Sequence, residues 1–386
     1  MIKLILISLS ILFYACSIPV TKDTEENNEV STEQIEMDEI TATDELIEVD
    51  EVKEFLAKTK IESKELEELI EKPMYEFTPE EIDEYLKFIH EVEPDLRKRV
   101  NHFAKKFIGQ SYEIYLLGEF PFEIYDPQPL YSIDKSDCVV FSEHVYAMAL
   151  SNNWKKFFAM LQRIRYKDGV IGLMTRNHFT EADWTVNNSW LIKNITDSLP
   201  GVKSKQVTTK IDRAKFFSKW GIGQDLPVQE LNWSYIPASE VPKALKYLKT
   251  GDFVNVVRGY TPDDVYVGHV GIISVGSNGV VYLIHSTDPE VKMEPLLEYM
   301  KRSLELNKSR QKENARIAKK NEEIMKYNQK LRAQNNGDPH PDEKSLLNMK
   351  PLFYGFSFFE LQENALENLK KIDGTKAPKV TIYGED

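Results

Sequence analysis

Apolar residues recur at helical spacing through the first half of the chain after residue 60. The sequence Thr78-Pro79-Glu80-Glu81 has the residues of a capping box, with proline at the first helical position, and marks one helix start. Gly109 follows another apolar pattern and is expected to end that helix. Helices are predicted at residues 62–71, 79–90, 94–108, 139–150 and 157–166.

After residue 250 the pattern changes to short runs of β-branched and aromatic residues, which is typical of strands. Two of these runs flank Gly276-Ser277-Asn278-Gly279 and predict a β-hairpin. Strands are predicted at residues 253–258, 266–275, 280–286 and 353–359.

The loop length of this hairpin decides which side chains share a face. A two-residue loop would place His269 and His285 on opposite faces of the sheet. A three-residue loop pairs position 276 with position 280, and Gly279 takes the left-handed conformation. Both histidines then share a face, one diagonal step apart, within reach of long side chains. We predict the three-residue loop.

The charge of the chain is concentrated at one end. The 386 residues are 41% hydrophobic and carry a net charge of −13. Residues 23–52 contain thirteen acidic residues and no basic ones, so the remainder of the chain sums to zero. A nucleic-acid binder normally shows a basic patch on its folded domain, so no nucleic-acid partner is expected.

The N-terminus has the features of an export signal. Lys3 precedes an apolar run that is too short to span a bilayer, and Ala15 precedes Cys16 as in a bacterial lipobox. We expect a signal peptide at 1–15, lipidation at Cys16 and an acidic linker at 16–52. The alternative is an ordinary secretory signal. The expected location is the bacterial cell envelope, periplasmic or outer-membrane associated, with the membrane contacted through the lipid anchor.

The remaining chain divides into a helical accessory segment at 53–92 and a larger domain at 93–386. The domain contains a charged insertion at 299–348, whose residues 299–334 hold eleven basic and four acidic side chains. An exposed helix inserted between strands is the favoured interpretation, and an arm that binds anionic envelope polymers is the alternative.

Cys138 stands at the start of a predicted helix, where the positive end of the helix dipole lowers the pKa of a thiol. A nucleophilic cysteine also needs a base and a group that orients the base. His269 and His285 of the hairpin supply both. A buried structural thiol is the alternative for Cys138, and a zinc site formed by these three residues and a water is another.

Taken together, these residues resemble the NlpC-type papain-like cysteine peptidases, and in particular their N-acetylmuramoyl-L-alanine amidase-like branch. The resemblance covers about residues 95–295 and 353–359, while 53–92 and 299–348 depart from it. The matching segments are Asp137-Cys138-Val139-Val140-Phe141-Ser142-Glu143, Ile164-Arg165-Tyr166-Lys167-Asp168-Gly169, Arg176-Asn177-His178-Phe179, Asp183-Trp184, Gly251-Asp252, Gly268-His269-Val270-Gly271 and His285.

The resemblance implies an α+β, papain-like fold in which the helix bearing the nucleophile packs on a small antiparallel sheet. It also implies hydrolysis of the bond between N-acetylmuramic acid and L-alanine in peptidoglycan fragments, without a cofactor or metal. Cys138 would attack the carbonyl, His269 would carry the proton and His285 would orient His269.

Substrate contacts are assigned less directly. Arg176, Asn177, His178, Asp183 and Trp184 are the candidates, with Trp184 offering an aromatic face and Arg176 and Asn177 offering donors. His178 has an alternative role, which is to organise its loop through hydrogen bonds. Two alternative functions stay open: an endopeptidase for the γ-D-glutamyl–diamino acid bond, and a muropeptide-binding lipoprotein without turnover.

Overall fold

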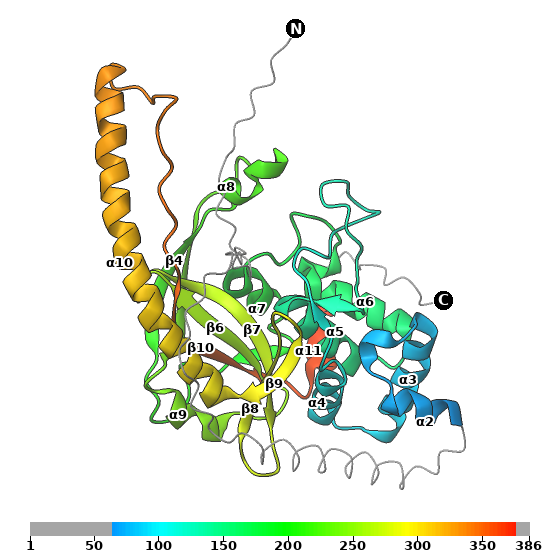
Figure 1. The fold of residues 1–386 in the computed structure, drawn as a ribbon. Coiled ribbons are helices and arrows are strands. Elements are labelled where there is room, and N and C mark those ends of the chain that lie inside the picture. The colour runs from blue at the N-terminus through cyan, green and yellow to red at the C-terminus, as the bar shows by residue number, and fades with distance from the viewer. Residues whose placement is uncertain (1–63, 376–386) are drawn as a thin grey trace, which may run out of the picture.

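The computed structural model describes residues 64–375, in which helices lie on both sides of an antiparallel sheet (Figure 1). The predicted leader at 1–15, the lipidation site Cys16, the linker to residue 52 and residues 53–63 lie outside the described residues. The helices are α2 (Lys64–Glu71), α3 (Pro79–Val92), α4 (Leu96–Lys106), α5 (Cys138–Ala149), α6 (Trp154–Arg165), α7 (Thr185–Asn187), α8 (Arg213–Phe217), α9 (Val241–Ala244), α10 (Leu296–Gln334) and α11 (Ala365–Thr375).

A side-chain cap starts α3 where the sequence predicts it. Thr78 accepts a hydrogen bond from the Glu81 amide while the Glu81 carboxylate accepts from the Thr78 amide, which confirms the capping box of α3. Gly109, with φ of +89°, follows α4 in the left-handed conformation expected after a helix end. The predicted helix at 157–166 begins three residues earlier, because Asn153 caps it.

The sheet has eight strands and is therefore larger than the small sheet expected from the sequence. Seven strands follow the order β4-β5-β10-β6-β7-β8-β9, and β3 pairs with β10. The extra width comes mainly from β4 and β5, which the sequence patterns did not identify. The strands of this sheet are β3 (Ile192–Asn194), β4 (Lys205–Ile211), β5 (Gln229–Pro237), β6 (Phe253–Gly259), β7 (Val265–Val275), β8 (Val281–Ser286), β9 (Val291–Pro295) and β10 (Leu352–Leu361).

The hairpin β7–β8 has the predicted register. Ile272 pairs with Ile284 and Val275 with Val281, and the Gly276 amide donates to the Val280 carbonyl. The loop therefore has three residues, and Gly279 has the expected positive φ, at +77°. This confirms the bulged turn and with it the shared face of the two histidines.

Two hydrophobic clusters fix the helices to the sheet. One contains Cys138 and most of the apolar residues of α5, together with Val270 and Ile284 of the hairpin. The other contains Leu283 of β8 and the first turns of α10. Helix α5 and the base of α10 thus both pack against the β7–β8 hairpin.

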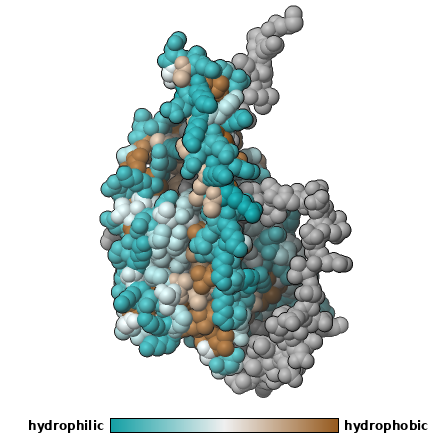
Figure 2. Space-filling model, turned by 60° about the vertical axis from the view of Figure 1, so that its left-hand side comes forward, coloured by the Kyte–Doolittle hydropathy of each residue, from teal (hydrophilic) through white to brown (hydrophobic). Residues whose placement is uncertain are grey.

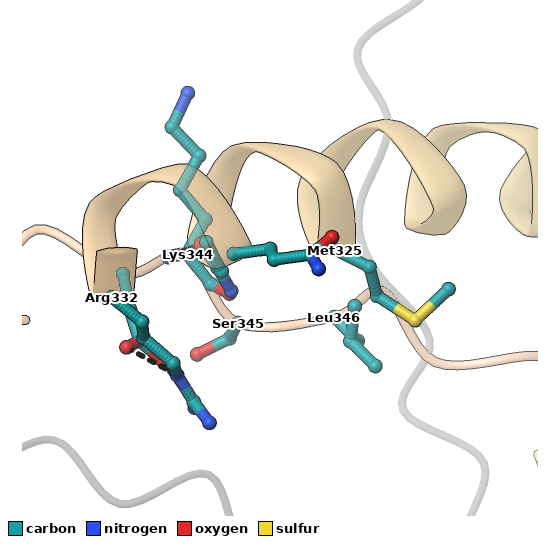
Figure 3. Close-up of a pocket in the computed structure, with 8 residues that line it drawn as sticks. Met325, Arg332, Lys344, Ser345 and Leu346 are labelled. Atoms are coloured by element: carbon teal, nitrogen blue, oxygen red, sulfur yellow. Dashed lines mark hydrogen bonds and ion pairs between the residues drawn. The ribbon is translucent and has the colours of Figure 1, made fainter. Parts of the chain in front are cut away.

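The charged insertion is a 39-residue helix, α10, followed by an extended return segment that leads to β10 (Figure 1). This confirms the predicted helix. Figure 2 turns the left-hand side of Figure 1, where α10 lies, towards the reader, and the surface there is mostly hydrophilic. A shallow pocket near the tip lies between Met325 of the helix and Leu346 of the return segment (Figure 3).

A ladder of asparagines holds the return segment against α10. Each asparagine side chain donates to the carbonyl and accepts from the amide of one residue opposite, at 2.7–2.9 Å. The asparagines are seven residues apart and their partners are three residues apart. The pairs are Asn307–Phe353, Asn314–Lys350, Asn321–Leu347 and Asn328–Lys344.

Candidate active site

Cys138 is the first residue of α5, and its neighbour Asp137 caps the helix. One carboxylate oxygen of Asp137 accepts from the Val139 and Val140 amides, each at 2.9 Å. Burial raises the pKa of Asp137, and these amide donors oppose the shift. Cys138 is fully buried in this structure, which a nucleophile in a covered cleft and a structural thiol have in common.

The two predicted histidines meet as the hairpin register requires. His269 Nε2 lies 2.6 Å from His285 Nδ1, and the two rings are nearly perpendicular. Gly271 lies across from His285, and a methyl group at this position would stand 3.1 Å from the His285 Cβ. The missing side chain at residue 271 therefore leaves room for the histidine pair.

A carboxylate that the sequence analysis missed continues this chain of contacts. His285 Nε2 lies 2.9 Å from Glu294 Oε1, on the neighbouring strand β9. Arg302 of α10 binds the same carboxylate through both of its terminal nitrogens, at 2.6 and 2.8 Å. The sequence could have indicated Glu294 through its position directly after β8, because consecutive strands joined by a short turn usually pair. Residues 291–295 were not recognised as a strand, so this signal was not used.

Tyr299 of α10 covers the histidine pair. Its ring is almost parallel to that of His269 and meets the edge of His285, with centroids 6.3 and 5.5 Å apart. Its hydroxyl accepts a hydrogen bond from Arg258 of β6. The base of the charged insertion therefore forms one wall of the site.

Burial determines the charge states of these groups. It holds the pKa of His269 well below the ordinary value, and the neighbouring His285 adds to the effect. Burial also lowers the pKa of His285, although Glu294 opposes it. Burial alone would raise the pKa of Glu294, but hydrogen bonds from His285 and Arg302 outweigh it and lower that pKa to about 2. At neutral pH the group is two neutral imidazoles beside one carboxylate.

A hydrogen bond places the start of α5 near the histidine strands. The Ser286 hydroxyl, next to His285, donates to the carbonyl of Ser136, two residues before Cys138, at 2.8 Å. Tyr112 belongs to β1 (Ser111–Tyr112), which pairs with β2 (Lys135–Ser136) just before α5. Burial raises the pKa of Tyr112, with Asp137 adding to the shift and Arg258 opposing it.

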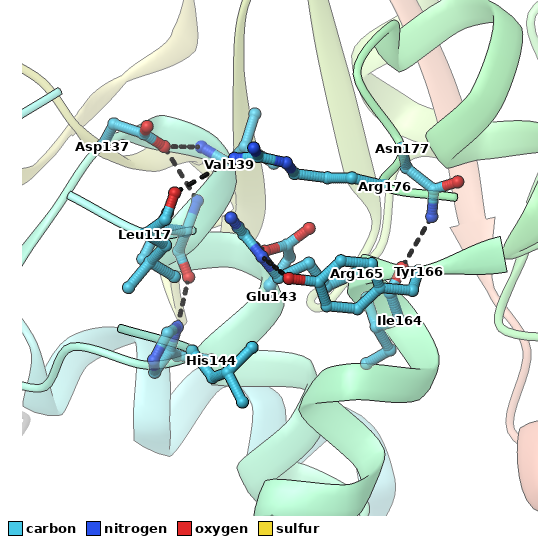
Figure 4. Close-up of polar contacts among 12 residues, drawn as sticks. Leu117, Asp137, Val139, Glu143, His144, Ile164, Arg165, Tyr166, Arg176 and Asn177 are labelled. Carbon is cyan, nitrogen blue, oxygen red and sulfur yellow. Dashed lines mark hydrogen bonds and ion pairs between the residues drawn. The ribbon is translucent and has the colours of Figure 1, made fainter. Parts of the chain in front are cut away.

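A buried ion pair joins Glu143 of α5 to Arg165 of α6 (Figure 4). Glu143 accepts from the Trp184 indole at 3.0 Å and from Arg165 at 3.4 Å. Burial raises the pKa of Glu143 to about 7, against the attraction of Arg165. These contacts join α5 to α6 and to the π-helical turn η3 (Thr180–Trp184).

The prediction that Trp184 presents an aromatic face to a substrate is wrong. The side chain is only 1% exposed, and its ring stacks on Phe253 with centroids 4.5 Å apart. Asn177 is also buried: its amide donates to the Ile164 carbonyl and accepts from Asn187. Both residues are held by protein contacts, and little of either side chain is exposed.

Arg176, His178 and Asp183 are likewise occupied by protein partners. Arg176 forms ion pairs with Glu119 and Asp126. It also donates a hydrogen bond to the Leu117 carbonyl (Figure 4). His178 Nε2 lies 2.6 Å from the Leu173 carbonyl, which supports the loop-organising interpretation. Asp183 accepts from the Phe179 amide and pairs with Arg213. In this structure these three predicted substrate residues hold their loop together through contacts within the protein.

Within residues 64–375, no cluster of three or more His, Cys, Asp or Glu side chains has an arrangement suited to a metal ion. Nor does that part contain a helix with both the length and the apolar character needed to cross a bilayer.

A family model described as AmiA-like, N-acetylmuramoyl-L-alanine amidase-like, matches residues 102–305, more than half of the chain. None of the curated proteins matches the sequence significantly.

Two solved structures are similar at low sequence identity. One is a Legionella pneumophila protein with the family label DUF1460, with a TM-score of 0.55 and 18% identity over 73% of this chain and 94% of that one. The other is an N-acetylmuramoyl-L-alanine amidase from Bacteroides uniformis, with a TM-score of 0.45 and 19% identity over 69% of this chain and 99% of that one. The Legionella protein shares the fold.

Proposed function

Because this chain belongs to the N-acetylmuramoyl-L-alanine amidase-like family, we propose that it hydrolyses the N-acetylmuramoyl–L-alanine bond of peptidoglycan fragments with Cys138 as nucleophile. The family indicates an enzyme that hydrolyses amide bonds in peptidoglycan-derived substrates. The finer assignments, a papain-like NlpC-type domain and a Cys138–His269–His285 triad, are part of the proposal. The observation that carries it is the 2.6 Å contact between the two histidines in the predicted hairpin register.

The proposed reaction proceeds in two steps. His269 takes the proton of the Cys138 thiol, and the sulfur attacks the lactyl carbonyl carbon. The carbon–nitrogen bond then breaks, and His269 returns the proton to the departing amine of L-alanine. Water hydrolyses the resulting thioester, with His269 again accepting and returning a proton, which releases the muramyl carboxylic acid and restores the thiol.

The proposed location is the bacterial cell envelope. We infer from the lipobox that Cys16 carries a lipid and that the acidic residues after it tether the catalytic domain to a membrane surface. Such a tether would confine the enzyme to soluble fragments near that membrane. Labelling cells with a fatty-acid analogue, with Cys16→Ser as the unlabelled comparison, tests the anchor directly.

The activity is tested on full-length protein in detergent, with a reductant present so that Cys138 is a thiol. A defined anhydro-muropeptide is incubated with the wild type, Cys138→Ala and Cys16→Ser, and the products are read by mass spectrometry. We expect free sugar and an intact stem peptide beginning at L-alanine from the wild type and from Cys16→Ser, and no product from Cys138→Ala. Since the chain has two cysteines, Cys16→Ser is the matched control.

Other outcomes assign other functions. Release of a sugar that still carries L-alanyl-D-glutamate would move the cut to the γ-D-glutamyl bond. Binding of muropeptides without any product would support the non-catalytic lipoprotein. Loss of turnover in the presence of a chelator would favour a metal at Cys138, His269 and His285.

A further inference from the structure

We propose that Glu294 is a positioning residue of the active site, which fixes the tautomers of His285 and His269 so that His269 Nδ1 is free to accept a proton. The inference rests on the proposed function, because it assigns His269 as the base. It adds a fourth group to the triad and connects that group to the charged insertion through Arg302.

The donors and acceptors along this chain of contacts determine which ring nitrogens carry protons. A carboxylate only accepts hydrogen bonds, so the 2.9 Å contact with Glu294 requires a proton on His285 Nε2. A neutral imidazole has a single N–H, so His285 Nδ1 is then an acceptor. The 2.6 Å contact must therefore be donated by His269 Nε2, and His269 Nδ1 is left without a proton.

Without the carboxylate, this direction is not determined. The same two rings could bond with His285 Nδ1 as donor and His269 Nε2 as acceptor. In that arrangement His269 carries its proton on Nδ1 and has no nitrogen left to take a proton from a thiol. The carboxylate of Glu294 therefore selects the arrangement in which His269 can accept a proton over one of similar hydrogen-bond geometry in which it cannot.

Arg302 makes the carboxylate suitable for this task. It binds both oxygens of Glu294, so the side chain is oriented and kept ionised. Lys292 Nζ, on the same strand as Glu294, lies 3.5 Å from Oε1 and adds positive charge. The contacts place Glu294 and Lys292 of β9, Arg258 of β6, and Tyr299 and Arg302 of α10 around the histidines. The proposed function adds Cys138 of α5 as a further titratable group.

The kinetic test uses full-length protein with the muropeptide assay above. Glu294→Gln replaces the carboxylate with an amide of similar shape that can also donate, so the tautomer is no longer selected. Loss of the correct tautomer costs about 10⁴ in kcat when the orienting carboxylate touches the base directly. Glu294 acts through one further ring, and we expect a loss of about 10–100-fold in kcat with little change in KM. Glu294→Asp should recover part of the loss.

The matched control is Glu298→Gln, which removes an exposed carboxylate from the first turn of α10 where it pairs with Lys301. This variant should keep wild-type activity. The pH profile provides a further readout, since Glu294→Gln removes a negative charge near the pair and should lower the pH at which the histidines gain a proton. Wild-type kcat and an unchanged pH profile in Glu294→Gln would overturn the inference.

A spectroscopic test separates this inference from the proposed function. Nitrogen-15 NMR of the full-length Cys138→Ala protein, with labelled histidine, distinguishes bare ring nitrogens from protonated ones. We expect His269 Nδ1 to be bare and His285 Nε2 to be protonated, and Glu294→Gln to put protons partly on His269 Nδ1. Identical tautomers in both proteins would refute the role of Glu294 even if the enzyme is active. If these tautomers are found but the wild-type protein turns over no muropeptide, only the proposed function is refuted.

Discussion

Substitution of Gly271 by alanine should damage the site more than its small size suggests. A Cβ atom at residue 271 would lie 2.6 Å from the Leu283 Cδ1, 2.8 Å from the Ile284 carbonyl oxygen and 3.1 Å from the His285 Cβ. The leucine side chain can rotate away, but the carbonyl belongs to the strand itself. The backbone of β8 therefore has to move to accommodate the methyl group.

The size of the movement follows from these distances. Ordinary contacts of a Cβ begin at 3.4 Å, so the Ile284 carbonyl must retreat by about 0.6 Å. A displacement of that size carries His285 with it and stretches the 2.6 Å contact with His269 to the limit of a hydrogen bond. Overpacking of this kind costs about 1–3 kcal/mol of the free energy of unfolding.

The assay compares Gly271→Ala with Gly279→Ala, a change in the turn of the same hairpin. Gly279 has φ of +77° and nothing within 4 Å of an added methyl group, so this variant pays only backbone strain of about 1–2 kcal/mol. Both variants should lose stability in urea denaturation, but only Gly271→Ala should lose amidase activity, by at least about tenfold. Equal activity losses would show that stability, and not the position of His285, controls the rate. Full stability and activity in Gly271→Ala would refute the reasoning.

Three further predictions concern the buried Trp184, the asparagine ladder and Glu294. Trp184→Ala should lower the free energy of unfolding by about 3–5 kcal/mol in urea denaturation, since a large buried ring is lost; a raised KM with unchanged stability would restore its role in substrate binding. Asn321→Ala removes both bonds to Leu347 and should speed hydrogen exchange of the Leu347 amide, at a local cost of about 1–2 kcal/mol; unchanged exchange would contradict the ladder. The pKa of Glu294 is lowered from 4.5 to about 2, so its stabilising contribution is complete above about pH 5 and disappears as the pH falls towards 2. The difference in unfolding free energy between wild type and Glu294→Gln should shrink over that range, and a constant difference would contradict the assigned pKa.

Features that depend on local chemistry were predictable from the sequence. The capping box at Thr78 needs only residues close in the chain, and so does the turn that ends in Gly279. The turn then fixes the register of β7 and β8, which in turn brings His269 and His285 together although they are sixteen residues apart. The prediction of the three-residue turn was therefore sufficient to predict that His269 and His285 meet.

Features that depend on the surroundings were not predictable in this way. Trp184 and Asn177 occur in a polar, aromatic stretch, and that composition is the same whether such residues face a ligand or the interior. Glu294 becomes part of the site only because β9 pairs with β8 and α10 supplies Arg302. Strands β4 and β5 pair with each other at one side of the sheet. Apolar and polar residues alternate only weakly in their sequences, so the pattern did not indicate strands.

The asparagine ladder between α10 and its return segment restricts how the length of this insertion can change. Seven helical residues advance about 10.5 Å, and three extended residues advance about 10 Å, which is why one asparagine per heptad matches every third residue opposite. Each rung grips only the backbone, so the side chains of the return segment are free to differ. The arm can therefore grow or shrink in paired units, seven residues on the outward path with three on the way back, whereas an insertion on one path alone shifts every rung beyond it.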